Sequence, residues 1–92
     1  QAEIPTVAVR FLREAIARHG MSVREVGEAI ETAFRGVAAS RVLEGDAVFD
    51  LVVRFDPAAR TSIETMRELL LTTPAGAQVP LAALADLSRD RV

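Results

Sequence analysis

Few residues in this sequence are able to do chemistry. His19 is the single histidine among 92 residues, and cysteine is absent. The chain therefore has no thiolate metal ligand, no cysteine nucleophile and no internal disulfide. No serine stands in a nucleophile-elbow motif, and no glycine-rich loop carries the lysine of a phosphate-binding P-loop. The sequence predicts no enzyme activity, no cofactor and no metal site.

The remaining candidate ligands have simpler structural interpretations. His19 precedes Gly20, where a helix is expected to end, and an imidazole there can serve the last carbonyl groups. Met21 and Met66 are the only thioethers, and soft metals such as monovalent copper or silver prefer sulfur ligands. Two methionines in separate elements, without a third ligand, make a poor site. The apolar neighbours of Met66 instead predict that it fills the core.

Three acidic residues follow one another at three-residue spacing, and they are Glu25, Glu28 and Glu31. On a helix this spacing places them on one polar face. They are able in principle to hold a hard cation, but such rows are commonly solvated. We therefore interpret them as the solvent-facing side of an amphipathic helix.

The composition is that of a folded protein, with 50% hydrophobic and 26% charged residues. The net charge of −2 opposes binding to nucleic acid phosphates. Aromatic residues are all Phe, and Phe11, Phe49 and Phe55 fall at expected buried strand positions, which disfavours an RNA-stacking sheet. No stretch approaches the roughly 20 apolar residues that span a bilayer. The first residues suggest a cut inside a longer protein.

The spacing of apolar residues predicts a small α+β domain. Alternation indicates strands, and spacing of three and four residues indicates helices. The expected elements are a strand over 6–12, a helical turn over 14–18, a helix from 23 to Gly36, strands over 37–43 and 47–55, a helix to about 68, strands over 69–72 and 78–81, and an exit segment over 84–92. The order matches a ferredoxin-like βαββαβ sandwich with an extra terminal β-hairpin, in a single domain over 1–92.

Two helix starts carry local signals. Ser22 stands three residues before Glu25, which is the pattern of a capping box. Thr61 and Glu64 have the same spacing and suggest a second box. A Gly-Asp pair between the two strands 37–43 and 47–55 predicts a hairpin.

Three segments, in order, resemble one protein family. They are Arg-Glu-Ala-Ile-Ala-Arg-His-Gly-Met-Ser over 13–22, the run from Gly36 to Arg54 containing Leu-Glu-Gly-Asp and Phe-Asp-Leu-Val-Val-Arg, and Thr-Pro-Ala-Gly-Ala-Gln-Val-Pro-Leu over 73–81. Together they resemble the periplasmic docking subdomain of resistance-nodulation-division efflux pumps, in the heavy-metal branch and the copy in the C-terminal half. The sequence departs from the usual pattern at Leu12, His19 and 46–48.

The resemblance implies a parent that is a trimeric, proton-driven exporter of heavy-metal cations in the inner membrane of a Gram-negative bacterium. Its docking subdomains meet other protomers, a periplasmic adaptor and an outer-membrane channel. The proton relay and metal-binding residues of such pumps lie outside this chain, so the fragment is expected to contribute contacts and not chemistry, and to stay outside the membrane.

Two turns are the expected contact points, because each holds small or charged residues between hydrophobic strands. Their residues are Glu44, Gly45, Asp46 and Ala47 in the first, and Pro74, Ala75, Gly76 and Gln78 in the second. Two other functions stay open from the sequence. One is the same subdomain in a drug-exporting branch, and the other is a free-standing ferredoxin-like module that binds a ligand or a metal.

Overall fold

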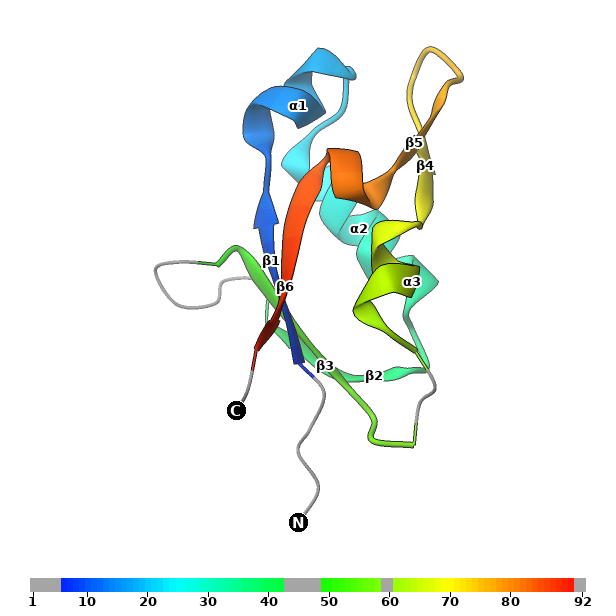
Figure 1. Ribbon diagram of the computed structural model, residues 1–92. Helices are drawn as coiled ribbons and strands as arrows, with labels where there is room; N and C mark the ends of the chain where they lie inside the picture. The colour runs from blue at the N-terminus through cyan, green and yellow to red at the C-terminus, as the bar shows by residue number, and fades with distance from the viewer. Residues whose placement is uncertain (1–5, 43–48, 59–60, 91–92) are drawn as a thin grey trace.

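The computed structural model describes residues 6–42, 49–58 and 61–90 (Figure 1). The statements below concern these residues. The elements in chain order are β1 (Thr6–Phe11), α1 (Arg13–Arg18), α2 (Val23–Ala33), β2 (Ala38–Val42), β3 (Leu51–Phe55), α3 (Ile63–Arg67), β4 (Leu70–Thr72), β5 (Gln78–Pro80), the 3₁₀ turn η1 (Leu81–Ala83) and β6 (Ala85–Asp90).

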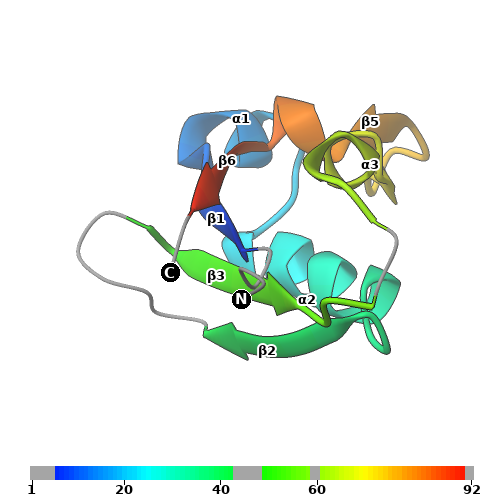
Figure 2. The same cartoon turned by 60° about the horizontal axis from the view of Figure 1, so that its bottom comes forward.

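The main sheet has the strand order β2-β3-β1-β6, and neighbouring strands run antiparallel. Figures 1 and 2 show α2 and α3 on the same side of this sheet. Sheet order and helix placement are those of a ferredoxin-like α+β sandwich, which confirms the predicted fold class.

The fourth strand of the sheet is β6, which differs from the sequence-based expectation. Residues 84–92 were expected only to leave the domain, whereas β6 pairs with β1 from Thr6 opposite Asp90 to Phe11 opposite Ala85. Strands β4 and β5 form a separate two-stranded sheet, so the hairpin is an insertion between α3 and β6 and not a terminal addition. Ala85 and Leu87 are buried and Asp86 and Ser88 exposed, the alternation of a strand with one covered face.

Helix α2 begins as its sequence predicts. The amide of Glu25 donates to Ser22 Oγ at 3.1 Å, and the amide of Ser22 donates to Glu25 Oε1 at 2.8 Å. This reciprocal pair satisfies two amides that the helix itself leaves without partners. Val26 and Ile30 then point into the core, while Gly36 has a φ of +93°, a conformation that favours glycine after a helix end.

Helix α3 begins one residue later than the predicted box. Its N-cap is Ser62, whose Oγ accepts from the amide of Thr65 at 3.2 Å. Thr61 therefore does not cap the helix. Glu64 lies in the first turn and pairs with Arg89 of β6 at 3.5 Å. The predicted second capping box is wrong because the hydroxyl that accepts from the first turn of α3 belongs to Ser62, directly before Ile63, and not to Thr61.

The hydrophobic core lies between the sheet and the helices. Its fully buried side chains are Ile16, Ile30, Leu51, Met66, Leu81, Leu84, Val9, Val26 and Val53. Phe34 and Phe55 meet edge to face, with ring centroids 5.9 Å apart. Burying each large apolar side chain contributes about 1.5–3 kcal/mol, so this layer supplies the main stabilisation of the fold.

The strand expected over 47–55 is shorter in the structure. It starts at Leu51, and Phe49, expected at a buried strand position, lies before it and is half-buried. The tip of the hairpin expected between β2 and β3 lies outside the described residues. The rest of the pairing is present, with an irregularity in register between Ala38 and Ser40.

Candidate interaction surface

The β4–β5 hairpin is held at its turn by one threonine. Thr73 is only 6% exposed. Its amide donates to the carbonyl of Ala77 at 2.8 Å, its carbonyl accepts from Gly76 at 2.9 Å, and its Oγ1 accepts from the amide of Ala77 at 3.2 Å. Three hydrogen bonds on one buried residue fix the shape of the loop that follows it.

The turn residues named from the sequence come together at this tip. Pro74, Ala75, Gly76 and Gln78 are all exposed, and Gly76 has a φ of +91°, which favours glycine. The other four predicted contact residues, Glu44, Gly45, Asp46 and Ala47, lie outside the described residues. The structure therefore presents one of the two predicted turns.

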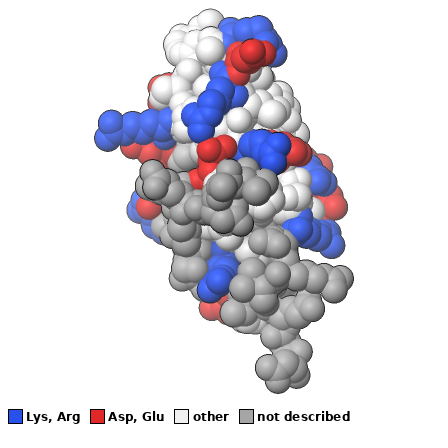
Figure 3. All heavy atoms as spheres, turned by 90° about the vertical axis from the view of Figure 1, so that its left-hand side faces the viewer, with Lys and Arg blue, Asp and Glu red and all other residues white. Residues whose placement is uncertain are grey.

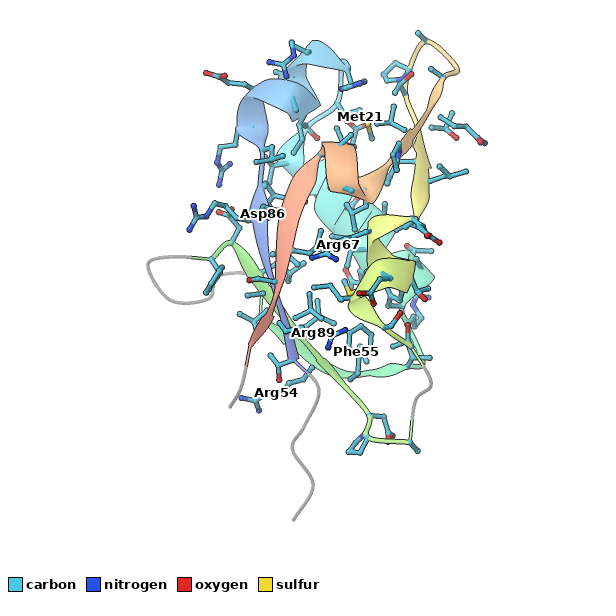
Figure 4. The ribbon with its side chains drawn as sticks, in the orientation of Figure 1. Met21, Arg54, Phe55, Arg67, Asp86 and Arg89 are labelled. Carbon is cyan, nitrogen blue, oxygen red and sulfur yellow. The ribbon has the colours of Figure 1, made fainter. Side chains whose placement is uncertain are left out.

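The connection between α1 and α2 supports the base of the tip. Gly20 has a φ of +73°, and a Cβ added there would lie 3.7 Å from Pro74 Cγ. The next residue, Met21, is half-buried and packs on the core, and Figure 4 shows it in this connection. The tip consequently stands at the same end of the molecule as α1, away from the start of β1 and the end of β6 (Figure 1).

The surface of the hairpin is uncharged. From Leu69 to Ala85 no residue bears a charge, although 26% of the chain is charged. Leu70 is 56% exposed, and its cross-strand partner Pro80 is exposed as well. A large exposed apolar side chain beside an exposed proline is a surface suited to contact with protein rather than to ionic binding.

Three of the candidate ligands named from the sequence have structural roles, and they are His19, Met66 and Glu25. His19 Nδ1 lies 2.8 Å from the carbonyl oxygen of Ala15, so the imidazole serves the end of α1 as predicted. Met66 is 0% exposed in the core, and Glu25 is engaged in the capping box. Within the described ranges, no three His, Cys, Asp or Glu side chains gather as a metal site.

Charges of both signs are mixed on the face of Figure 3, which is the left-hand side of Figure 1. Acidic and basic side chains alternate there without a broad area of one sign. A nucleic-acid site typically shows a basic patch or stripe. The face seen in Figure 3 has no such patch among the described residues.

Two structural contacts were not foreseen from the sequence. The carboxylate of Asp50 accepts from the amide of Phe11 at 2.9 Å and from Arg13 Nη2 at 2.7 Å, which joins the start of β3 to the end of β1 and to α1. Arg67 of α3 donates to the carbonyl of Leu87 in β6 at 3.2 Å (Figure 4). All three bonds link residues at least 20 positions apart in the chain, so local patterns give no signal for them.

Comparison with known proteins places this chain in a family. Residues 1–91 match the AcrB/AcrD/AcrF family, and the chain belongs to it. It is 38% identical over 85 residues to the nickel and cobalt resistance protein CnrA of Cupriavidus metallidurans, covering 87% of this chain. It is 33% identical over 89 residues to the cobalt-zinc-cadmium resistance protein CzcA of that organism, and 32% identical over 81 residues to the cation efflux system protein CusA of Escherichia coli K12, covering 91% and 88% of this chain.

These relatives are metal-resistance and cation-efflux proteins, which confirms the resemblance to the heavy-metal branch of the resistance-nodulation-division pumps. The chain spans 8% of the length of each of the three relatives. Among the described residues, no helix has the length and apolar character needed to cross a membrane.

Proposed function

We propose that this chain is a docking module of a heavy-metal efflux transporter, and that it works through protein contacts alone. The observation that carries the proposal is the match of nearly the whole chain to a small part of metal-resistance and cation-efflux proteins. The surface that would make the contacts is the β4–β5 hairpin, centred on Ala75 and Gly76. The relatives named above favour the metal branch over the drug-exporting branch.

The arrangement of the strands supports this role. Thr6 and Asp90 are direct cross-strand partners, so a longer polypeptide would enter and leave the module at one end. The hairpin tip stands at the opposite end in Figure 1. A module held at one end by its parent and carrying an uncharged hairpin at the other is well placed to reach a neighbour.

The partners in this proposal follow from the family. They are the other protomers of a trimer, a periplasmic adaptor protein and an outer-membrane channel, with the module on the periplasmic side of the inner membrane. We assign the module to the docking copy in the C-terminal half of the pump, because the run from Gly36 to Arg54 resembles that copy. The remainder of the transporter would supply the proton relay and the metal path.

Substitution at the tip tests the contact role. We expect Ala75→Asp in the complete transporter to reduce co-purification of adaptor and channel roughly tenfold, because a carboxylate would have to be desolvated in an uncharged contact. Glu28→Gln on the exposed face of α2 is the matched control and should leave co-purification unchanged. Equal recovery with both variants would contradict the assignment of the tip.

Metal titration separates this proposal from a free-standing metal-binding module. We expect calorimetry of the 92-residue chain with zinc, monovalent copper and silver to show no stoichiometric binding, because His19 and Met66 are engaged as described above. Affinity at about the micromolar level or tighter, which corresponds to about −8 kcal/mol, would overturn the purely interfacial role.

A further inference from the structure

The strand edges of this fold differ in how they are protected. An unpaired edge offers N–H and C=O groups to another strand, and proteins commonly block such edges with charged side chains, prolines or bulges. On β6, Arg67 Nη2 occupies the outward carbonyl of Leu87, and Arg89 pairs with Glu64 beside it. This edge of the main sheet is therefore protected by two charged side chains, Arg67 and Arg89.

Two further edges are each interrupted at one point. On β2, at the other side of the main sheet, the register shifts between Ala38 and Ser40, as at a β-bulge. On β5 the two outward-facing residues are Gln78 and Pro80, and Pro80 has no amide hydrogen to donate, so this edge offers one outward amide where β4 offers two. Three of the four outer edges in the described part of the chain thus carry a known form of protection.

The outer edge of β4 has none of these features. The amide of Thr73 donates to the carbonyl of Ala77, and the amide of Leu81 donates to the carbonyl of Leu69. The main-chain N–H and C=O groups of the odd-numbered residues therefore point toward the partner strand of the hairpin. In an antiparallel pair the intervening residues turn their main-chain groups away. Leu70 and Thr72 therefore direct two N–H and two C=O groups outward, and no hydrogen bond to a described residue engages them.

We propose that the β4 edge is a strand-addition site, and that its occupant is an extended, uncharged segment of a neighbouring polypeptide in the assembly. Main-chain bonds to Leu70 and Thr72 would give the register. The exposed side chains of Leu70 and Pro80 would contact one face of the added strand. The absence of charge from Leu69 to Ala85 favours an uncharged segment, since a charged one would lose hydration without gaining a partner.

The short length of the edge decides between possible occupants. Four main-chain groups allow only a few hydrogen bonds. A stable complex between two independent proteins typically buries roughly 1,200 Å² or more, which this short edge does not provide by itself. A second copy of the chain would offer only the same few atoms. A segment already held nearby by other contacts needs much less intrinsic affinity. For this reason the inference rests on the proposed docking role, which supplies such a neighbour.

Hydrogen exchange provides the direct test. We expect the amides of Leu70 and Thr72 to exchange roughly tenfold or more slowly in the assembled transporter than in the isolated chain, whereas the amide of Gln78 is little changed. Gln78 is the cross-strand partner of Thr72 and equally turned outward, which makes it the internal control. Equal protection of Thr72 and Gln78 would refute edge pairing. Slow exchange that rises with the concentration of the isolated chain would identify a second copy instead and contradict the proposed occupant.

Proline substitution gives an independent readout. Thr72→Pro removes an outward amide from β4, and Gln78→Pro removes the matching amide from β5. We expect only Thr72→Pro to lower recovery of the assembled complex, by roughly tenfold. If Thr72→Pro does not fold, Leu70→Lys takes its place, because a lysine on an edge strand blocks pairing with another strand. If a folded β4 variant leaves recovery unchanged while Ala75→Asp still lowers it, the strand-addition site is refuted and the docking role stands. If neither variant lowers recovery, the docking role is refuted as well.

Discussion

The carboxylate of Asp50 provides a quantitative test of how the sheet is joined to α1. Its two partners differ in environment. Phe11, whose amide donates to it, is 7% exposed, whereas the Arg13 side chain is 62% exposed. Asp50→Ala leaves a buried amide without an acceptor, which should destabilise the fold by about 1.5–3 kcal/mol. Arg13→Ala removes only an exposed ion pair and should cost about 0.2–1 kcal/mol.

A third variant separates the hydrogen bond from the charge. Asp50→Asn keeps an oxygen that can accept from Phe11, so its effect should fall between the other two, at about 0.5–1.5 kcal/mol. Urea unfolding of the 92-residue chain, followed by far-ultraviolet circular dichroism, measures all three free energies of unfolding. The reasoning is refuted if Asp50→Ala destabilises the chain no more than Arg13→Ala does.

Three further changes test the helices and the core. Ser22→Ala removes the cap of α2 and should lower the unfolding free energy by about 1 kcal/mol. Met66→Ala leaves a cavity at a fully buried position and should destabilise the fold by about 2–5 kcal/mol. Met21→Ala, at a half-buried position, should have a clearly smaller effect. Gly27→Ala should stabilise α2 by about 0.5–1 kcal/mol, because its Cβ would meet Phe11 Cζ at an ordinary 3.8 Å.

The same unfolding measurements decide these three. A neutral Ser22→Ala would mean that the capping box contributes nothing measurable. Equal losses at the two methionines would contradict the assignment of Met66 to the core and Met21 to its margin. A destabilising Gly27→Ala would show that the helix approaches Phe11 more closely than described.

Local features of the fold were predictable from the sequence. Ser22 and Glu25 lie three residues apart, and their reciprocal bonds need no distant partner, so the start of α2 was predicted correctly. Glycines after α1 and α2 stand where the chain requires a positive φ. Alternation in β1 and the helical spacing of Val26 and Ile30 identified core residues, although β1 also buries Thr6 and Ala8 on the face that alternation predicts to be exposed. These signals depend on near neighbours in the chain.

Features that need distant partners were missed. Strand β6 ends in Ser88, Arg89 and Asp90, a weak strand pattern, and it forms because the free edge of β1 pairs with it. The hydrogen bond from the amide of Phe11 to Asp50 joins residues 39 positions apart, so no local motif predicts it. The turn with Pro74 and Gly76 was found from its residue types, whereas the role of Thr73 beneath it depends on tertiary burial.

The most direct test of the docking role is site-specific photo-cross-linking from the hairpin tip. A photoreactive residue at Ala75 of the complete transporter should capture a neighbouring protomer, the adaptor or the channel in the assembled complex. The same residue at Glu28, on the exposed face of α2, serves as the control for random contact. The account predicts a discrete adduct from Ala75 and much less from Glu28. No adduct from Ala75, or equal capture from both positions, would contradict it.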